Sequence, residues 1–220
     1  GGALRDRLNG GLSAALDGTG DIEANDLTIT GTGASSNIGT SAGAPLEINA
    51  TTLFDASTAG GNIFVADITD DFDAVGVVNA NGGTVDLRTT AGSIVADLDV
   101  AGQNRSAVSG SNLTFVATGS GAAVGTMARP INTTGSNLEG SADSGGFFVA
   151  NTGDLTIGGV NGIVGVSAAH GNIDISAASS IDVDEDIDSN GGSVTLDATE
   201  DVNVNAAIRS DSGAVAVRAD

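Results

Sequence analysis

The sequence predicts an all-β protein whose chain coils into a parallel β-helix, a solenoid of short strands. The first observation is a repeat without gaps: Gly171, Gly192 and Gly213 lie 21 residues apart and open the phrases GNIDISA, GSVTLDA and GAVAVRA. The second is that apolar and polar residues alternate within each phrase, which is the period of a strand and not of a helix. The third is that a period of 21 residues leaves no room for a helix between copies, and a propeller blade needs about 40 residues or more.

At 21 residues per coil, the 220 residues make about ten rungs and a rod on the order of 50 Å long. At the start of the chain, Leu4 and Leu8 lie four residues apart and precede Gly10-Gly11, so residues 1–10 could form a short capping helix. The sequence that follows has the composition and alternation of strands, with predicted strand segments at 27–29, 84–87, 93–100, 113–115, 155–157 and 163–166.

Two segments, 38–66 and 124–150, are expected to be equivalent repeat units. The phrase IGT at 38–40 reappears as VGT at 124–126, and GGNIFVA at 60–66 reappears as GGFFVA at 145–150. The only two prolines, Pro45 and Pro130, hold matching places, where no ladder N–H is needed. The separation of 84 to 86 residues predicts a unit of four rungs. No linker interrupts the chain, so 1–220 is expected to be a single β-helix segment, and since it begins without Met we expect it to belong to a longer chain.

The regular rungs at 171–220 predict continuous apolar columns. Residues one coil apart stack at about 4.8 Å, so their inward side chains form rows that exclude water. Each coil should have three strands, at roughly 173–176, 180–184 and 186–188, with glycines at the sharp turns. The expected columns are Ile173–Val194–Val215, Ile175–Leu196–Val217, Ile181–Val202, Val183–Val204 and Ile187–Ile208.

The composition excludes several classes of partner. There are 28 acidic residues against seven basic ones, and the net charge of −21 makes nucleic acid and anionic membranes poor partners, because phosphate binding needs clustered Lys and Arg. Aromatic residues are only 3%, which disfavours an aromatic-lined groove. No apolar run approaches 18 residues, so this segment is not expected to span a membrane.

The unit IGT/VGT…P…L…GG-x-FV-A, followed by DLTI and by the rungs at 171–220, resembles the β-helical repeats of filamentous-haemagglutinin-like adhesins, the bacterial exoproteins of two-partner secretion and autotransporter systems. The resemblance covers nearly the whole chain. It implies a right-handed parallel β-helix and export to the extracellular space or the bacterial cell surface. It also implies a non-enzymatic role as a structural and adhesive stalk, with a glycan or protein of a cell surface or matrix as partner.

The sharpest candidate site is a calcium loop formed by Asp186, Asp188, Asn190 and Asp197. With Gly191, these residues have the spacing of an EF-hand loop, in which short oxygen side chains surround a hard cation and glycine permits the turn. Asp197 replaces the usual Glu, however, and the next rung has lost the pattern. The alternative interpretation is that these acids decorate a solvated turn, as do Asp67, Asp70, Asp71 and Asp73 in a second acidic cluster. A calcium-stiffened filament subunit that self-associates end to end therefore stays open.

Catalysis has little support in the sequence. His170 is the only histidine and lies beside Gly171 at a rung corner, where a structural role is expected. The main alternative to a non-enzymatic stalk is a carbohydrate-active β-helix enzyme, a lyase or glycosidase, because paired carboxylates on one strand face could act as acid and base. Such an enzyme requires a groove with converging carboxylates, which a stalk does not.

Overall fold

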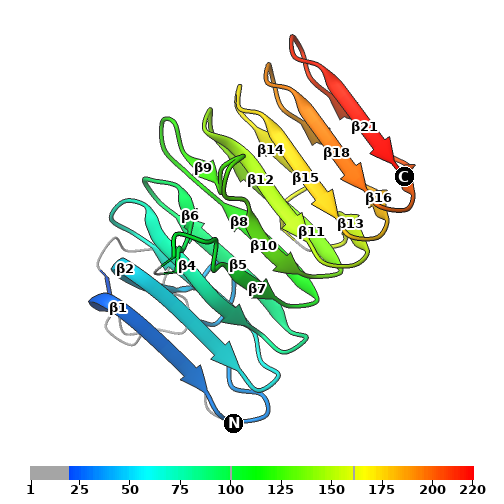
Figure 1. Cartoon of the computed structure of the whole chain (residues 1–220). Coiled ribbons are helices and arrows are strands. Elements are labelled where there is room, and N and C mark those ends of the chain that lie inside the picture. The colour runs from blue at the N-terminus through cyan, green and yellow to red at the C-terminus, as the bar shows by residue number, and fades with distance from the viewer. Residues whose placement is uncertain (1–19, 100, 161) are drawn as a thin grey trace.

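The computed structural model describes residues 20–99, 101–160 and 162–220, and in these residues the protein is all-β without a helix. The strands pair in parallel in one 21-stranded sheet that winds into a β-solenoid of about eight turns, as predicted (Figure 1). The capping helix predicted over 1–10 lies outside the described residues. The strands are β1 Ile22–Gly31, β2 Leu46–Thr58, β3 Ile63–Asp67, β4 Phe72–Asn79, β5 Thr84–Thr89, β6 Ile94–Ala96, β7 Ala107–Ser109, β8 Asn112–Val116, β9 Ala123–Val124, β10 Ile131–Thr134, β11 Asn137–Ala142, β12 Gly146–Asn151, β13 Leu155–Ile157, β14 Val166–Ala168, β15 Ile173–Ala177, β16 Ile181–Val183, β17 Ile187–Asp188, β18 Val194–Ala198, β19 Val202–Val204, β20 Ile208–Arg209 and β21 Val215–Ala219.

The register of the last three coils confirms every predicted column. Strands β15, β18 and β21 stack one on the next, as do β16 with β19 and β17 with β20. The paired residues are Ile173–Val194–Val215, Ile175–Leu196–Val217, Ile181–Val202, Val183–Val204 and Ile187–Ile208. The three strands per coil are also found where the alternation predicted them.

The turns of these coils depend on glycines that stack directly on one another. A Cβ atom added at Gly192 would lie 2.1 Å from the carbonyl oxygen of Gly171, and one added at Gly213 would lie 2.3 Å from that of Gly192. A contact this short is a clash with backbone, so only glycine lets consecutive coils approach at this corner. The 21-residue glycine repeat therefore reflects a packing constraint.

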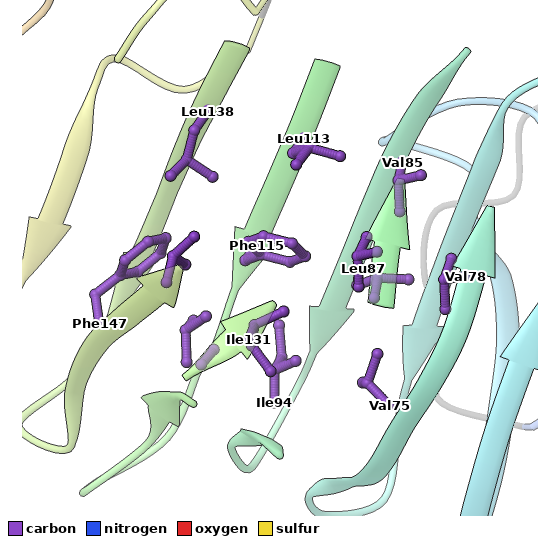
Figure 2. Close-up of a cluster of buried hydrophobic side chains, with 14 of the residues drawn as sticks. Val75, Val78, Val85, Leu87, Ile94, Leu113, Phe115, Ile131, Leu138 and Phe147 are labelled. Carbon is purple, nitrogen blue, oxygen red and sulfur yellow. The ribbon is translucent and has the colours of Figure 1, made fainter. Parts of the chain in front are cut away.

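The apolar interior runs through the solenoid as one core. Figure 2 shows inward side chains of successive strands in this core, among them Leu87, Phe115 and Phe147. Phe115 and Phe147 are fully buried, and so is the edge-to-face pair of Phe54 and Phe72, whose ring centroids are 4.9 Å apart. Burial of such a side chain contributes about 1.5–3 kcal/mol, so the core is the main source of stability.

The coils of the middle region are longer than predicted. Stacked residues are 28 positions apart from Leu87 to Phe115, 25 from Phe115 to Gly140 and 26 from Gly140 to Val166, but 21 from Val166 to Ile187. The prediction of about ten rungs was therefore too high. The additional residues form two excursions, one described at 97–99 and 101–105 and the other at 125–130, each closed by a short antiparallel bridge. They also form a loop, called loop 158–165, whose described residues are 158–160 and 162–165.

The segments 38–66 and 124–150 share the same local geometry. In both, a glycine with positive φ (Gly39, 72°; Gly125, 61°) turns the chain outward into a tight excursion, and a proline returns it to the coil. The four-rung interpretation is wrong, however. Ile63 stacks in one column with Val85, Leu113 and Leu138, whereas Phe147 lies one strand further along, on β12. Because the middle coils exceed 21 residues, the repeat spans little more than three coils.

Candidate functional site

The predicted calcium loop begins at Asp186, just before β17, and Asp186 is held by the next coil. Its carboxylate accepts hydrogen bonds from Nη1 of Arg209 at 2.5 Å and from the backbone N–H of Ala207 at 3.0 Å. The hydrogen bond from Arg209 is the main reason that the pKa of Asp186 lies below its usual range. A guanidinium thus holds the carboxylate that would begin the calcium loop.

The other predicted ligands have separate roles in the structure. Oδ1 of Asp188 accepts the backbone N–H of Asn190 at 2.9 Å, which holds a turn in which Asn190 has a φ of 43°. Asp197 lies on β18, with its side chain 50% exposed and 3.9 Å from Arg218. Within the described part of the chain, no group of three or more acidic or histidine side chains is arranged to hold a metal ion. Calcium binding by Asp186, Asp188, Asn190 and Asp197 stays a prediction, in which the ion would compete with Arg209.

Asp67 of the second acidic cluster is fully buried, contrary to the expectation of a solvated face. Its carboxylate accepts hydrogen bonds from the backbone N–H groups of Ala50 and Thr69, each at 3.2 Å. Burial raises the pKa of Asp67 although these bonds oppose the shift. Asp67 thus links two coils and is not part of a surface that collects cations.

A second buried acid lies under the loop 158–165. Glu139 on β11 is fully buried, and its Oε1 accepts the backbone N–H of Val160 at 2.7 Å. Glu185 faces it, and its Oε2 accepts the backbone N–H of Gly165 at 2.7 Å. Burial and the charge of Glu185 raise the pKa of Glu139, against the effect of the Val160 bond. The loop is therefore fastened to two carboxyl groups that repel each other when both are ionised.

A hollow of about 150 Å³ lies between the excursion 125–130 and the outward faces of β12 and β15. Its lining residues are Met127, Pro130, Phe148, Val149, Asp174 and Ser176. Because residues alternate along a strand, Phe147 points into the core and Phe148 points outward. The excursion covers Phe148, which is only 7% exposed, while Met127 at its tip is 69% exposed. One wall of the hollow is therefore apolar, and the other is formed by the polar side chains of β15.

Asp174 supplies the charge of this hollow. It stacks directly on Phe148 in the neighbouring coil. No hydrogen-bond donor contacts its carboxylate among the residues described. Burial and then the charge of Asp197 raise the pKa of Asp174, and Arg218 partly offsets them. A carboxylate beside an aromatic ring, without a donor of its own, is suited to bind a cationic or hydrogen-bond-donating group.

Two further hollows lie at the turns between strands and are lined by small polar residues. One, of about 360 Å³, includes Ser111, Ser136 and Asp154, and the other, of about 470 Å³, includes Thr118, Ser120 and Asp143. The carboxylate of Asp154 is already bound, since it accepts Ser179 Oγ at 2.5 Å. Each of the three hollows has one lining carboxylate, although Asp197 lies near enough to Asp174 to shift its pKa.

The apolar–polar alternation of β15 puts Asp174 on the outer face of its strand, opposite Ile173 and Ile175, but the hollow was not predicted. The available signal was the pair Phe147-Phe148: in an alternating strand one of two adjacent phenylalanines must face outward. The chain has only six Phe, and one that faces outward leaves apolar surface in water unless another segment packs on it. The excursion 125–130 packs on Phe148 in this way.

Comparisons with known proteins gave no identification: no family model, no curated protein and no solved structure matches this chain. A search of the described residues for helices that are long and apolar enough to cross a membrane found none.

Proposed function

We propose that this chain is a non-enzymatic stalk segment of an exported bacterial surface protein or filament, which provides rigid extension and multivalent adhesive contact. The observation that carries the proposal is the single parallel sheet from β1 to β21, whose coils are joined by backbone ladders over a continuous apolar core. Such a solenoid extends in one direction and resists bending, because every coil is bonded to its neighbours. Eight turns at about 4.8 Å extend on the order of 40 Å.

The surface also supports an adhesive role. Two of its three hollows are lined by small residues together with Ser, Thr and Asp, and the third has Asp174 and Ser176 on one wall. Shallow polar sites of this kind bind weakly one at a time, but many copies side by side gain avidity from their high effective concentration. The partner would be a glycan or a protein of a cell surface or matrix.

The proposal is tested with beads that carry the folded chain at increasing density, applied to surfaces coated with glycans or with matrix proteins. We expect adhesion to rise more steeply than in proportion to the density, while the free chain in solution competes poorly. Beads that carry the thermally unfolded chain are the control. Adhesion equal to this control on every surface would contradict the adhesive role, and hydrolysis or elimination of a polysaccharide by the free chain would contradict the non-enzymatic one.

One observation favours a carbohydrate-active enzyme as the second candidate. The pKa of Asp174 is raised, and a second carboxylate, that of Asp197, lies nearby. A glycosidase uses such a pair, in which the group with the raised pKa is the general acid and the other is the base or nucleophile. The hollow at Asp174 is small, however, and Arg218 approaches Asp197 to 3.9 Å. The polysaccharide assay described above distinguishes the two candidates, and the variant Asp174→Asn would abolish turnover if the enzyme interpretation holds.

A further inference from the structure

Each repeat unit, taken together with the strand that pairs with its end in the next coil, contains the same outward pair: a phenylalanine and the aspartate in register with it. In the first unit Phe64 pairs with Asp86, and in the second Phe148 pairs with Asp174. In both units the preceding coil forms its excursion beside the aromatic residue: a Cβ added at Gly39 would touch Phe64, and one added at Gly125 would touch the carbonyl oxygen of Phe148. The two places therefore have the same architecture, although they lie on different faces of the solenoid.

Two residues after the aspartate, on the same strand, the two places differ. In the first unit this residue is Arg88, which stacks on Ala66, and in the second it is Ser176, which stacks on Ala150. Since residues i and i+2 of a strand point to the same side, each of these side chains lies beside its own carboxylate.

Arg88 shows what the site accommodates. Its Nε donates to Oδ1 of Asp86 at 2.5 Å and its Nη2 donates to Oδ2 at 2.8 Å, so the guanidinium binds both carboxylate oxygens. The side chain of Asp86 is 4% exposed and that of Arg88 is 23% exposed. The first unit thus holds a bidentate arginine–carboxylate pair that is largely removed from water. This is the geometry in which arginine binds a carboxylate most strongly.

We propose that the hollow at Asp174 binds the guanidinium of an arginine side chain from a partner protein, in the position that Arg88 takes at Asp86. Ser176 leaves that position empty of charge and bulk, and the carboxylate of Asp174 has no donor among the described residues. The proposal names the partner chemistry of the adhesive contact and rests on the proposed function for its biological role.

The lining of the hollow fits the whole arginine side chain. Met127, Pro130 and Phe148 offer apolar surface to the aliphatic stem, and an aromatic ring in the lining attracts a cation. Asp197 adds negative potential, and the net charge of −21 attracts cationic partners over a longer range. Arg218 opposes this field, but its partner is Asp197 and it is 61% exposed. Lysine fits less well, because its ammonium cannot bind both carboxylate oxygens in one plane.

Binding is measured by titrating the isotope-labelled chain with the peptide acetyl-Gly-Arg-Gly-amide and following backbone NMR shifts. The control peptides replace Arg by citrulline, which has nearly the same shape without the charge, or by Lys. We expect saturable shifts at residues 148, 174 and 176 with the Arg peptide and about tenfold weaker binding of the citrulline peptide, because only the charged donor forms the strong bond. Equal binding of the Arg and citrulline peptides would overturn the proposal.

Two reciprocal variants test the comparison between the units. Ser176→Arg should supply an internal guanidinium to Asp174 and block the Arg peptide, while Arg88→Ser should open Asp86 and create a second binding site. Asp174→Asn should abolish the shifts, whereas Asp197→Asn should weaken binding by no more than about threefold, as expected for a charge that acts only through the field. Because Arg88→Ser leaves a buried carboxylate unpaired, circular-dichroism melting must first show that it folds. If Arg88→Ser does not fold, Ser176→Arg and Asp174→Asn test the arginine site on their own. Peptide binding that is unchanged in both variants would overturn the assignment.

The test separates this proposal from the adhesive function. Beads whose adhesion is unchanged by Asp174→Asn would show a stalk that adheres through another site, and this outcome would reject the arginine site alone. The arginine could also come from a second copy of this chain, and sedimentation velocity of the free chain tests this. Association that Asp174→Asn abolishes would assign the site to a second copy of this chain and would overturn the foreign partner.

Discussion

The middle coils and the C-terminal coils have the same interior but differ in what they carry outside. From Val166 onward each coil takes 21 residues, and short polar ladders line its outer side, such as Asn203 donating to Asp182 and Asn205 donating to Asp184, both at 2.8 Å. Between Leu87 and Val166 the coils take 25 to 28 residues, and the excess leaves the coil as excursions and loops.

This difference shows that coil geometry and surface features are set by different residues. The inward positions fix the stacking and tolerate any number of residues between strands, because a loop that leaves the coil does not disturb the ladder. The lined hollow at Phe148 and the pair formed by buried Glu139 and half-buried Glu185 lie where additional residues cover an outward strand face. The places capable of chemistry are therefore expected in the middle region.

Among the variants that test this difference between the regions, we expect the largest loss of stability at a buried aromatic residue of the middle coils. Phe115→Ala removes a fully buried ring and leaves a cavity that costs about 3–5 kcal/mol in the free energy of unfolding. Leu196→Ala, the matched change in the C-terminal coils, removes less volume and should cost about 2–3 kcal/mol, because the coil above it is itself half-exposed. Urea unfolding followed by circular dichroism measures both. A larger loss for Leu196→Ala would show that the regular coils are the more stable region.

A smaller loss is expected where the coils touch at their turns. Gly192→Ala places a methyl group 2.1 Å from the carbonyl oxygen of Gly171, so the two coils must separate, at a cost of about 1–3 kcal/mol. Gly43→Ala is the control, because this excursion glycine has nothing closer than Ser41 Oγ at 4.0 Å. Thermal melting of the two variants should show a lowered midpoint for Gly192→Ala alone. Equal midpoints would mean that the glycine repeat is not a packing constraint.

The same contrast explains what the sequence could and could not predict. The columns from Ile173 to Val215 were predicted because each residue there repeats its neighbour at a fixed interval and the environment of one coil repeats in the next. The number of coils was overestimated because excursions lengthen the middle coils without interrupting the alternation of their strands. The hollow at Asp174 was missed since it depends on which outward residue an excursion covers, and the burial of Glu139 was missed because an outward acid looks the same in sequence whether a loop covers it or not.

The stability of loop 158–165, a feature of the middle coils, should depend on pH through the carboxyl group of Glu139. A carboxyl group whose pKa is raised on folding stabilises the protein fully below its unfolded pKa of about 4.3, and this contribution is lost as the pH rises through the folded value. We therefore expect the amides of Val160 and Gly165 to exchange hydrogen faster as the pH rises, after correction for intrinsic rates.

Glu139→Gln should remove this dependence, because the neutral amide no longer repels Glu185, while Glu200→Gln on the exposed face should leave it unchanged. Protection of the loop that does not vary with pH in the unmodified chain would show that Glu139 does not change its ionisation over the range measured.

The smallest effect is expected at the predicted calcium loop of the C-terminal coils. Arg209 and Asp186 are both about half-exposed, so water screens their ion pair, and Arg209→Ala should lower stability only slightly. Because Arg209 occupies the carboxylate of Asp186, we expect millimolar calcium to leave the melting temperature of the unmodified chain unchanged. In Arg209→Ala the carboxylate is released, and calcium should then raise the midpoint, because a ligand that binds only the folded state stabilises it. A chelator that lowers the midpoint of the unmodified chain, with the effect lost in Asp188→Asn, would contradict this expectation and establish the calcium loop. Asp188 is the suitable variant because it belongs to that loop, whereas the ion pair of Arg209 is with Asp186.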